Sequence, residues 1–252
     1  MKRASSAQGI LRLLVLVAGA TLSLAAKADP DPIEPVNRAI FSFNDGVDKY
    51  ALKPAAQGYV AVVPLPARVA FSNFIDNFKD LPNAFNNLLQ GKVSDAASDV
   101  GRILVNTTLG IGGAIDVASE MGLEKHNEDF GQTLGRWGMG PGPYLVLPLL
   151  GPSTLRDTAA LPVDYYSGGR HLVIDDVPTR NIITGVDVLN KRAALLGADD
   201  ALGEAALDKY GFVRNFYLQR RVSLIYDGQP PREKFDDEDA EPGAGSDQGE
   251  KQ

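Results

Sequence analysis

The uncharged stretch Trp137–Leu155, WGMGPGPYLVLPLLGPSTL, restricts the fold more than any other part of the sequence. Arg136 and Arg156 close it at both ends. Its length would suit a bilayer span of about 20 residues, but it contains four prolines, and each removes a backbone donor from a helix. Its glycines do not form a phosphate-binding loop, because no Lys-Ser or Lys-Thr follows them. We therefore expect an apolar segment of irregular backbone, in which YLVLPLL is the only strand-like run.

The N-terminal residues carry the pattern of an export signal. Lys2 and Arg3 precede the apolar run Leu13–Ala26, and the sequence Ala-Lys-Ala that ends at Ala28 has small residues where signal peptidase reads them. We expect residues 1–28 to be a cleaved signal peptide. An uncleaved anchor is the alternative, but the apolar run is short for a transmembrane span of about 20 residues.

Charge and composition exclude several classes of function. Removal of the four basic residues of the leader changes the net charge of the chain from −7 to −11. A net-acidic protein lacks the dense Lys/Arg surface that nucleic-acid binding needs, so any attraction to a membrane must be mainly hydrophobic. The absence of cysteine excludes disulfides, thiolate metal sites and the lipidated cysteine of a lipoprotein. With two histidines in the whole chain, we expect no metal and no cofactor.

The body of the chain, residues 29–229, has the periodicity of a mainly α-helical domain. We expect Lys53-Pro54 to interrupt the first helix, Leu81-Pro82 to separate two others, and Gly91 to end a helix. From Pro230 onward Pro, Gly, Asp and Glu dominate, and residues 230–252 are expected to be a disordered acidic tail. The apolar residues recur at helical spacing over 36–47, 69–78, 81–89, 93–104, 182–196 and 206–217.

Catalytic readings of the sequence find little support. His126 lies near acidic residues, but no Gly-x-Ser-x-Gly elbow is present, and we interpret its surroundings as a solvated polar loop. His171, beside Arg170, has the pattern of a surface residue. The pair Asp175-Asp176 precedes Pro178 and is typical of a helix start, where acidic side chains complement the helix dipole. We expect no catalytic residue, and the protein is not expected to be an enzyme.

Aromatic residues alternate with asparagines in the segment from residue 71 to residue 89. Uncharged amides beside phenylalanines suit a helix that lies in the interfacial zone of a bilayer. The competing interpretation is a core-facing stripe with a polar outer face, which the pattern alone favours. The candidate membrane-interface residues are Phe71, Phe74, Phe78, Phe85, Leu88 and Leu89.

Five blocks of sequence resemble the MlaA (VacJ) family of outer-membrane proteins. They run in order from about Asp31 to Gly228: DPIEPVNRAIFSFND, LPARVAFSNFIDNFKDLPNAFNNLLQGK, RILVNTTLGIGGAIDVA, EDFGQTLGRWGMGPGPYLVLPLLGPSTLRD and YGFVRNFYLQRR. The fourth block is the most specific. One departure stands out: family members are typically lipoproteins, and this chain has no cysteine to lipidate.

The resemblance implies both a fold and an activity. The fold is a ring of amphipathic helices in the periplasmic leaflet of the outer membrane, around a central amphipathic passage. The activity is removal of misplaced phospholipids from the outer leaflet and their transfer to a soluble periplasmic lipid carrier, beside a trimeric porin. Two alternatives remain: an accessory protein that docks on a porin without transporting lipid, and an exported lipid-modifying enzyme.

The resemblance also predicts where the uncharged stretch Trp137–Leu155 lies in the fold. Irregular backbone at membrane depth is tolerated where it lines a water-accessible cavity, so we expect Gly138–Pro152 to form the wall or rim of the lipid passage. The alternative is a loop that closes the ring without touching lipid. Pro143 biases Gly142 toward extended backbone, and Gly142→Leu is therefore expected to be tolerated better than Gly140→Leu. The candidate passage residues are Phe43, Asn44, Gly138, Gly140, Gly142, Pro143 and Tyr144.

Overall fold

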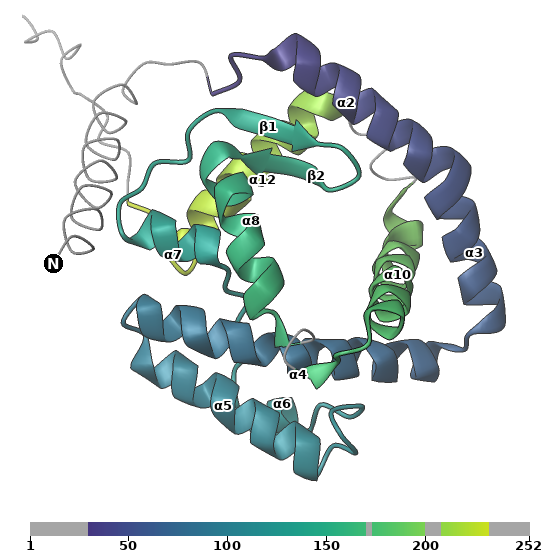
Figure 1. Cartoon of the computed structure of the whole chain (residues 1–252), viewed down its shortest axis with the longest axis vertical. Coiled ribbons are helices and arrows are strands. Elements are labelled where there is room, and N and C mark those ends of the chain that lie inside the picture. The colour runs from purple at the N-terminus through teal and green to yellow at the C-terminus, as the bar shows by residue number, and fades with distance from the viewer. Residues whose placement is uncertain (1–29, 170–172, 200–207, 232–252) are drawn as a thin grey trace, which may run out of the picture.

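The computed structural model describes residues 30–169, 173–199 and 208–231, and over these residues the chain is mainly helical, as expected. Seen down its shortest axis, this part of the chain closes into a ring of helices, with a small β-hairpin built into one side (Figure 1). The predicted signal peptide, residues 1–28, lies outside the described residues. So does the predicted acidic tail, apart from its first two residues.

The first side of the ring is a nearly continuous helical rod. α2 (Glu34–Val47) passes through a π-helical turn, Asp48–Leu52, into α3 (Lys53–Val62). The predicted interruption at Lys53-Pro54 is therefore wrong. Pro54 has no N–H with which to continue the α-helical ladder, and the chain widens just before it: the Lys53 N–H donates to the Asp48 carbonyl, five residues back.

A sharp corner separates this rod from the next side of the ring. Pro64 has extended backbone, with φ −66° and ψ 153°, and it turns the chain into α4 (Leu65–Leu89). No single described helix has both the length and the apolar character to cross a bilayer. Only Glu34–Val62 and Leu65–Leu89 taken together meet those criteria, and they are bent by 116° relative to each other.

The helix α4 runs straight through Pro82, so the predicted separation into two helices is wrong. A proline in a helix interior costs about 3 kcal/mol in isolation. Here α5 (Val93–Thr108) packs along α4, and tertiary packing of this kind overrides local propensity. Gly91, at φ +81°, ends the first helix of this pair as predicted, because a glycine reaches the left-handed conformation without a steric penalty.

The second half of the chain completes the ring. Its elements are α6 (Val117–Glu120), α7 (Phe130–Arg136), β1 (Tyr144–Leu147), β2 (Gly151–Thr154), α8 (Leu155–Ser167), α10 (Val177–Leu195), a 3-10 turn (Leu196–Ala198) and α12 (Lys209–Ile225). In Figure 1 the hairpin, α7, α8 and α12 lie together on one side, and α10 lies on the opposite side, just inside α3. The side chain of Asp176 accepts a hydrogen bond from the Thr179 N–H at 2.8 Å, so the predicted helix start at Asp175-Asp176 is confirmed.

The opening stretch is less irregular than its prolines and glycines predict. β1 and β2 are antiparallel, with Tyr144 opposite Thr154 and Leu147 opposite Gly151. Leu149 in the turn between them has a positive φ of +63°, and so does Gly151, the first residue of β2, at +83°. The strand-like run in the sequence is thus a real strand, and the irregular backbone is confined to the residues before it and to the turn.

The most unusual feature of the fold is the distribution of polarity between its inside and its outside. The buried side chains in the described part of the chain comprise 17 polar or charged residues and 11 apolar ones, six of which are alanine. Over the same residues, 35 large hydrophobic side chains are exposed. Buried charged side chains are rare in water-soluble proteins, and a surface with this much exposed apolar area indicates a partner that is itself apolar.

Candidate functional site

Asn37 attaches the free edge of the hairpin to α2. Its side-chain nitrogen donates to the Tyr144 carbonyl at 2.9 Å, and its oxygen accepts from the Val146 N–H at 2.9 Å. The same nitrogen also donates to Asp31 at 2.7 Å. All four residues are at most 3% exposed. A strand edge has backbone groups that need partners. Here the Asn37 amide pairs with one carbonyl and one N–H of β1, as a neighbouring strand would.

Asn44 repeats this arrangement at the tip of the hairpin, two helical turns further along α2. Its nitrogen donates to the Leu147 carbonyl at 2.9 Å, and its oxygen accepts from the Leu149 N–H at 2.8 Å. The sequence placed Asn44 and Phe43 beside the lipid passage. In the structure Asn44 holds the hairpin turn, and the neighbouring Phe43 is 55% exposed.

Tyr144 lies beneath the hairpin and not at a surface. Its side chain is 0% exposed and packs with Val146 and Tyr210 in the small apolar cluster, with the Tyr210 and Tyr217 rings both centred 6.2 Å away. Burial raises the pKa of Tyr144 to about 12, and the nearby Asp31 carboxylate adds to this effect. Its predicted place in the wall of a passage is wrong for the described conformation, because none of its side chain is accessible.

The glycines before the hairpin have the reverse of the expected conformations. Gly142 has φ +65°, and a Cβ there would lie 3.1 Å from the Cβ of Leu155. Gly140 has no positive φ and open space around it, whereas Gly138 has φ +90°. The rule that a residue before proline is extended depends on its Cβ, so Gly142 escapes it. The expected tolerance of Gly142→Leu over Gly140→Leu is therefore wrong.

The start of α8 ties this glycine-rich segment down. The Leu155 N–H donates to the Pro143 carbonyl at 3.0 Å, and the Arg156 N–H donates to the Pro141 carbonyl at 3.1 Å. These two bonds give partners to N–H groups in the first turn of a helix, which lack partners inside the helix. Pro143, predicted to line a passage, thus has a part in fixing the junction of hairpin and helix.

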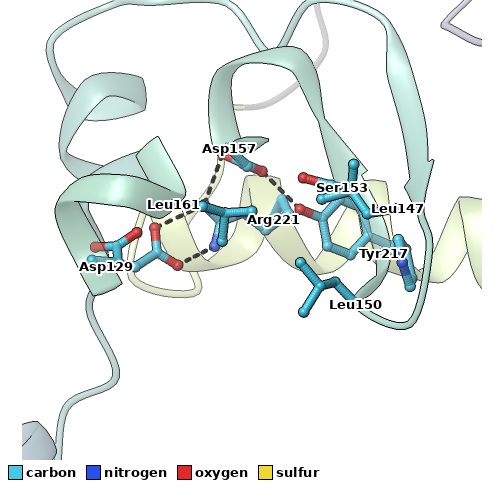
Figure 2. Close-up of a pocket in the computed structure, with 10 residues that line it drawn as sticks. Asp129, Leu147, Leu150, Ser153, Asp157, Leu161, Tyr217 and Arg221 are labelled. Atoms are coloured by element: carbon cyan, nitrogen blue, oxygen red, sulfur yellow. Dashed lines mark hydrogen bonds and ion pairs between the residues drawn. The ribbon is translucent and has the colours of Figure 1, made fainter. Parts of the chain in front are cut away.

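A pocket of about 240 Å³ opens between the hairpin, α8 and α12 (Figure 2). Figure 2 shows Arg221 in the middle of its polar part and Leu150, from the hairpin turn, at its apolar edge. Its lining residues are Asp129, Leu147, Leu150, Pro152, Ser153, Asp157, Leu161, Asp164, Tyr217 and Arg221. The pocket therefore combines acidic groups with an apolar edge.

The cation in this pocket is fully engaged with two carboxylates. Arg221 donates to both oxygens of Asp129, at 2.5 and 2.9 Å, and to Asp157 at 2.9 Å. The Tyr217 hydroxyl donates to the other oxygen of Asp157 at 2.8 Å. Burial raises the pKa of Asp157, but the charges of Arg221 and Arg156 outweigh it and hold the pKa below its usual value. Asp157 is therefore ionised at neutral pH.

Asp164 is the carboxylate in the pocket that has no ion pair with a described residue. One of its oxygens accepts from the Phe130 N–H at 2.7 Å. Burial raises the pKa of Asp164 to about 6; the Phe130 hydrogen bond opposes this shift, and the like charge of Asp129 adds to it. Since Arg221 and Arg156 pair with Asp129 and Asp157, the unbalanced negative charge of the pocket is that of Asp164.

The asparagines of α4 face inward, contrary to the expectation that they lie beside lipid. Asn83 donates to the His126 carbonyl at 2.6 Å and accepts from the Glu128 N–H at 3.0 Å. Asn87 donates to Asp99 at 2.8 Å. These hydrogen bonds hold the segment 126–128 and α5 against α4, which explains why asparagine stands where a surface helix would carry Lys or Glu.

The candidate interface residues of α4 divide into two groups. Phe85 is 49% and Leu88 is 56% exposed. Phe74 and Phe78 are half-buried and pack edge to face, with ring centres 4.9 Å apart. Phe71 and Leu89 are also half-buried. The C-terminal half of α4 is therefore polar inside and apolar outside, while its middle is shared between core and surface.

A buried arginine between α4, α5 and α6 is the centre that sequence reasoning missed. Arg102 is 1% exposed; it donates to Asp80 at 3.3 Å, and to the two oxygens of Asp116 at 3.0 and 3.1 Å. It also donates to the Ser119 hydroxyl and the Leu123 carbonyl, both at 2.9 Å. Burial raises the pKa of Asp80 to about 6 in spite of the opposing charge of Arg102. Its signal in the sequence is an arginine on the same helical face as Asp99 and Asn106.

The histidine that the sequence singled out is part of the same polar interior. His126 Nδ1 lies 2.8 Å from Asp99, which is fully buried, so the expected solvated loop is only partly correct. His171 lies outside the described residues. Within the described ranges, no group of three acidic or histidine side chains is placed to hold a metal ion.

A comparison with models of protein families identifies the family of this chain. The family model described as MlaA lipoprotein matches residues 29–224, which include nearly all the described helices and the hairpin. The chain belongs to the MlaA family. The resemblance of the five sequence blocks is thereby confirmed over the same part of the chain.

Two relatives and a solved structure are similar to this chain over most of its length. The Escherichia coli protein named intermembrane phospholipid transport system lipoprotein MlaA is 34% identical over 231 residues, covering 87% of this chain and 90% of that protein. An uncharacterized protein of Rickettsia bellii is 35% identical over 196 residues, covering 77% of this chain and 76% of its own length. A solved structure described as the structural basis for maintenance of bacterial outer membrane lipid asymmetry matches with a TM-score of 0.68 and 36% identity, and covers 77% of this chain and 98% of that one.

The MlaA assignment gives the inverted burial a context. Several MlaA relatives are named lipoproteins, whereas this chain contains no cysteine.

Proposed function

We propose that this protein transports phospholipids at the outer membrane of a Gram-negative bacterium and thereby maintains the lipid asymmetry of that membrane. The single observation that carries the proposal beyond family membership is the inverted burial of the ring. Most of the buried side chains are polar or charged, and many large apolar side chains are exposed. In a bilayer leaflet this distribution is favourable, because the exposed apolar groups leave water when they meet acyl chains.

The proposed route is a passage through the ring, past the hairpin turn. Phe43 and Leu149 are 55% and 69% exposed on either side of the Asn44 attachment, and they offer acyl chains an apolar surface. Gly138 and Gly140 have open space where a side chain would stand, which suits a segment that a large amphiphile must pass. This reasoning favours transport over catalysis as the role of the chain.

The family resemblance extends the proposal to location and partners. The protein is proposed to lie in the periplasmic leaflet of the outer membrane after removal of residues 1–28, to bind a trimeric porin, and to pass lipid to a soluble periplasmic carrier. The exposed apolar surface supports the leaflet position.

Two measurements test the proposal. Lipid extracted from the purified protein is identified by mass spectrometry, and the gene is tested for its ability to lower outer-leaflet phospholipid in a strain that lacks its own MlaA. We expect phospholipid bound to the protein and full complementation at matched protein level. A membrane-bound protein that carries no phospholipid and does not complement would indicate a porin-docked accessory instead.

A further inference from the structure

The acidic pocket beside the hairpin has a size and polarity that narrow the class of lipid the ring handles. This inference rests on the proposed transport function and adds a substrate preference to it. We infer that the pocket binds the head group of an aminophospholipid, that is, a zwitterion with a primary ammonium and a phosphate.

The volume of the pocket restricts what can enter it. Pockets for drug-sized ligands usually measure about 300–1,000 Å³, and this one measures about 240 Å³. This volume lies below that range, which matches a head group and not a whole phospholipid. The apolar edge formed by Leu150 and Leu161, which are 72% and 39% exposed, leaves room for acyl chains outside the pocket.

The charges in the pocket select a cation. Three carboxylates line it: Arg221 pairs with Asp129 and Asp157, and Asp157 also pairs with Arg156 at 2.9 Å, so Asp164 is the carboxylate left without a balancing cation. Asp164 uses one oxygen for the Phe130 N–H, and within the described part of the chain its other oxygen has no hydrogen-bond partner. A primary ammonium has three N–H donors and can complete this carboxylate.

The arginine of the pocket has no accessible donor left for an anion. Both terminal nitrogens of Arg221 are engaged by Asp129 and Asp157, and its Nε is buried from solvent. The second oxygen of Asp164 is therefore the group that an entering ligand can pair with, and it matches the ammonium end of a zwitterionic head group. An anionic glycerol head group lacks the ammonium and would meet the negative charge of Asp164.

The groups that face Asp164 define how the preference depends on pH. Asp129 from the start of α7, Asp157 from α8, and Tyr217 and Arg221 from α12 share the pocket with it. Arg221 and ionised Asp157 keep their charges between pH 5 and pH 7.5, and burial of Tyr217, next to the Asp157 carboxylate, raises its pKa and keeps it neutral. Asp164, with a pKa of about 6, loses its charge as the pH falls through this range, so the preference for an ammonium should weaken at pH 5.

The experiment incubates the purified full chain with detergent micelles that contain equal amounts of phosphatidylethanolamine and phosphatidylglycerol. Bound lipid is quantified by mass spectrometry after removal of the micelles. Asp164→Asn keeps the shape and the acceptor for the Phe130 N–H but removes the charge. The matched control is Glu120→Gln, which removes one charge from the exposed end of α6.

We expect wild type and the Glu120→Gln control to retain phosphatidylethanolamine over phosphatidylglycerol, and Asp164→Asn to lower that ratio on the order of threefold, the size expected for one partly exposed ion pair. Wild type at pH 5 should show the same fall, which provides a test that needs no substitution. A ratio of one in wild type, or a preference that neither Asp164→Asn nor pH 5 changes, would overturn the head-group inference and leave the transport proposal standing. Absence of any bound lipid in wild type would overturn both.

Discussion

Replacement of Asn44 by alanine is expected to loosen the hairpin turn without unfolding the ring. The Asn44 side chain makes two hydrogen bonds to the turn, at 2.9 Å to the Leu147 carbonyl and at 2.8 Å from the Leu149 N–H. Each such bond contributes about 1 kcal/mol net. Leu149 is 69% exposed, so water can replace the lost partners, and the expected loss is about 1–2 kcal/mol of local stability. That corresponds to a roughly 5- to 30-fold increase in the open population of the turn.

Hydrogen exchange measures this change directly. The protection of the Leu149 amide should fall by the same roughly 5- to 30-fold in Asn44→Ala, while amides in α5 keep theirs. Asn73→Ala is the matched control, because Asn73 donates a single bond at 3.2 Å to the Ala114 carbonyl, away from the hairpin. Unchanged exchange at Leu149, or a fall in protection shared equally by α5, would refute the assignment of Asn44 as the attachment of the turn.

Three further outcomes are expected. Gly140→Leu should keep the wild-type melting temperature. Gly142→Leu should lose about 2 kcal/mol of stability, because the left-handed backbone at Gly142 disfavours a side chain and Leu155 is close to it. Equal melting temperatures of the two variants would contradict this. Phe85→Asp combined with Leu88→Asp should release the protein from membranes with its circular dichroism unchanged, and loss of helicity would place both residues in the core. Burial raises the pKa of Asp116, but hydrogen bonds from Ser119, Asn106 and Arg102 outweigh it and lower the pKa to about 2. Its stabilising contribution is therefore present above pH 4 and lost as the pH falls toward 2, so urea midpoints of Asp116→Asn should change less over that range than those of wild type.

The sequence predicted which segments are helical because the spacing of apolar residues is a local property. It predicted the start at Asp176 and the end at Gly91 for the same reason, since caps depend on neighbours in the chain. The unbroken α4 at Pro82 depends on its packing against α5, which is a separate segment of the chain. No local rule carries that information.

The direction in which each helix faces was the harder problem. An amphipathic pattern in α4 shows that asparagines and phenylalanines lie on different faces, but it does not show which face is inside. For a water-soluble protein one would expect Phe85 to be buried and Asn87 to be exposed. In the structure Asn87 is buried and Phe85 is exposed. The same limit applied to the candidate site. The sequence singled out Asn44 but did not predict its hydrogen bonds to the hairpin. It did not predict the Arg221 pocket, because the pocket is lined by residues of four elements that come together only in the fold.

The inverted interior also has a thermal consequence. The heat capacity of unfolding is positive in ordinary globular proteins, at about 12–15 cal/mol/K per residue, because newly exposed apolar surface raises it more than newly exposed polar surface lowers it. In this ring the polar side chains, from Asp80 and Asn87 to Arg102 and Asp187, outnumber the apolar ones among the buried residues. The two contributions therefore come closer to cancelling. The curve of stability against temperature should be flatter than that of a water-soluble domain of equal length, and a ring held together in this way should lose little of its stability on cooling.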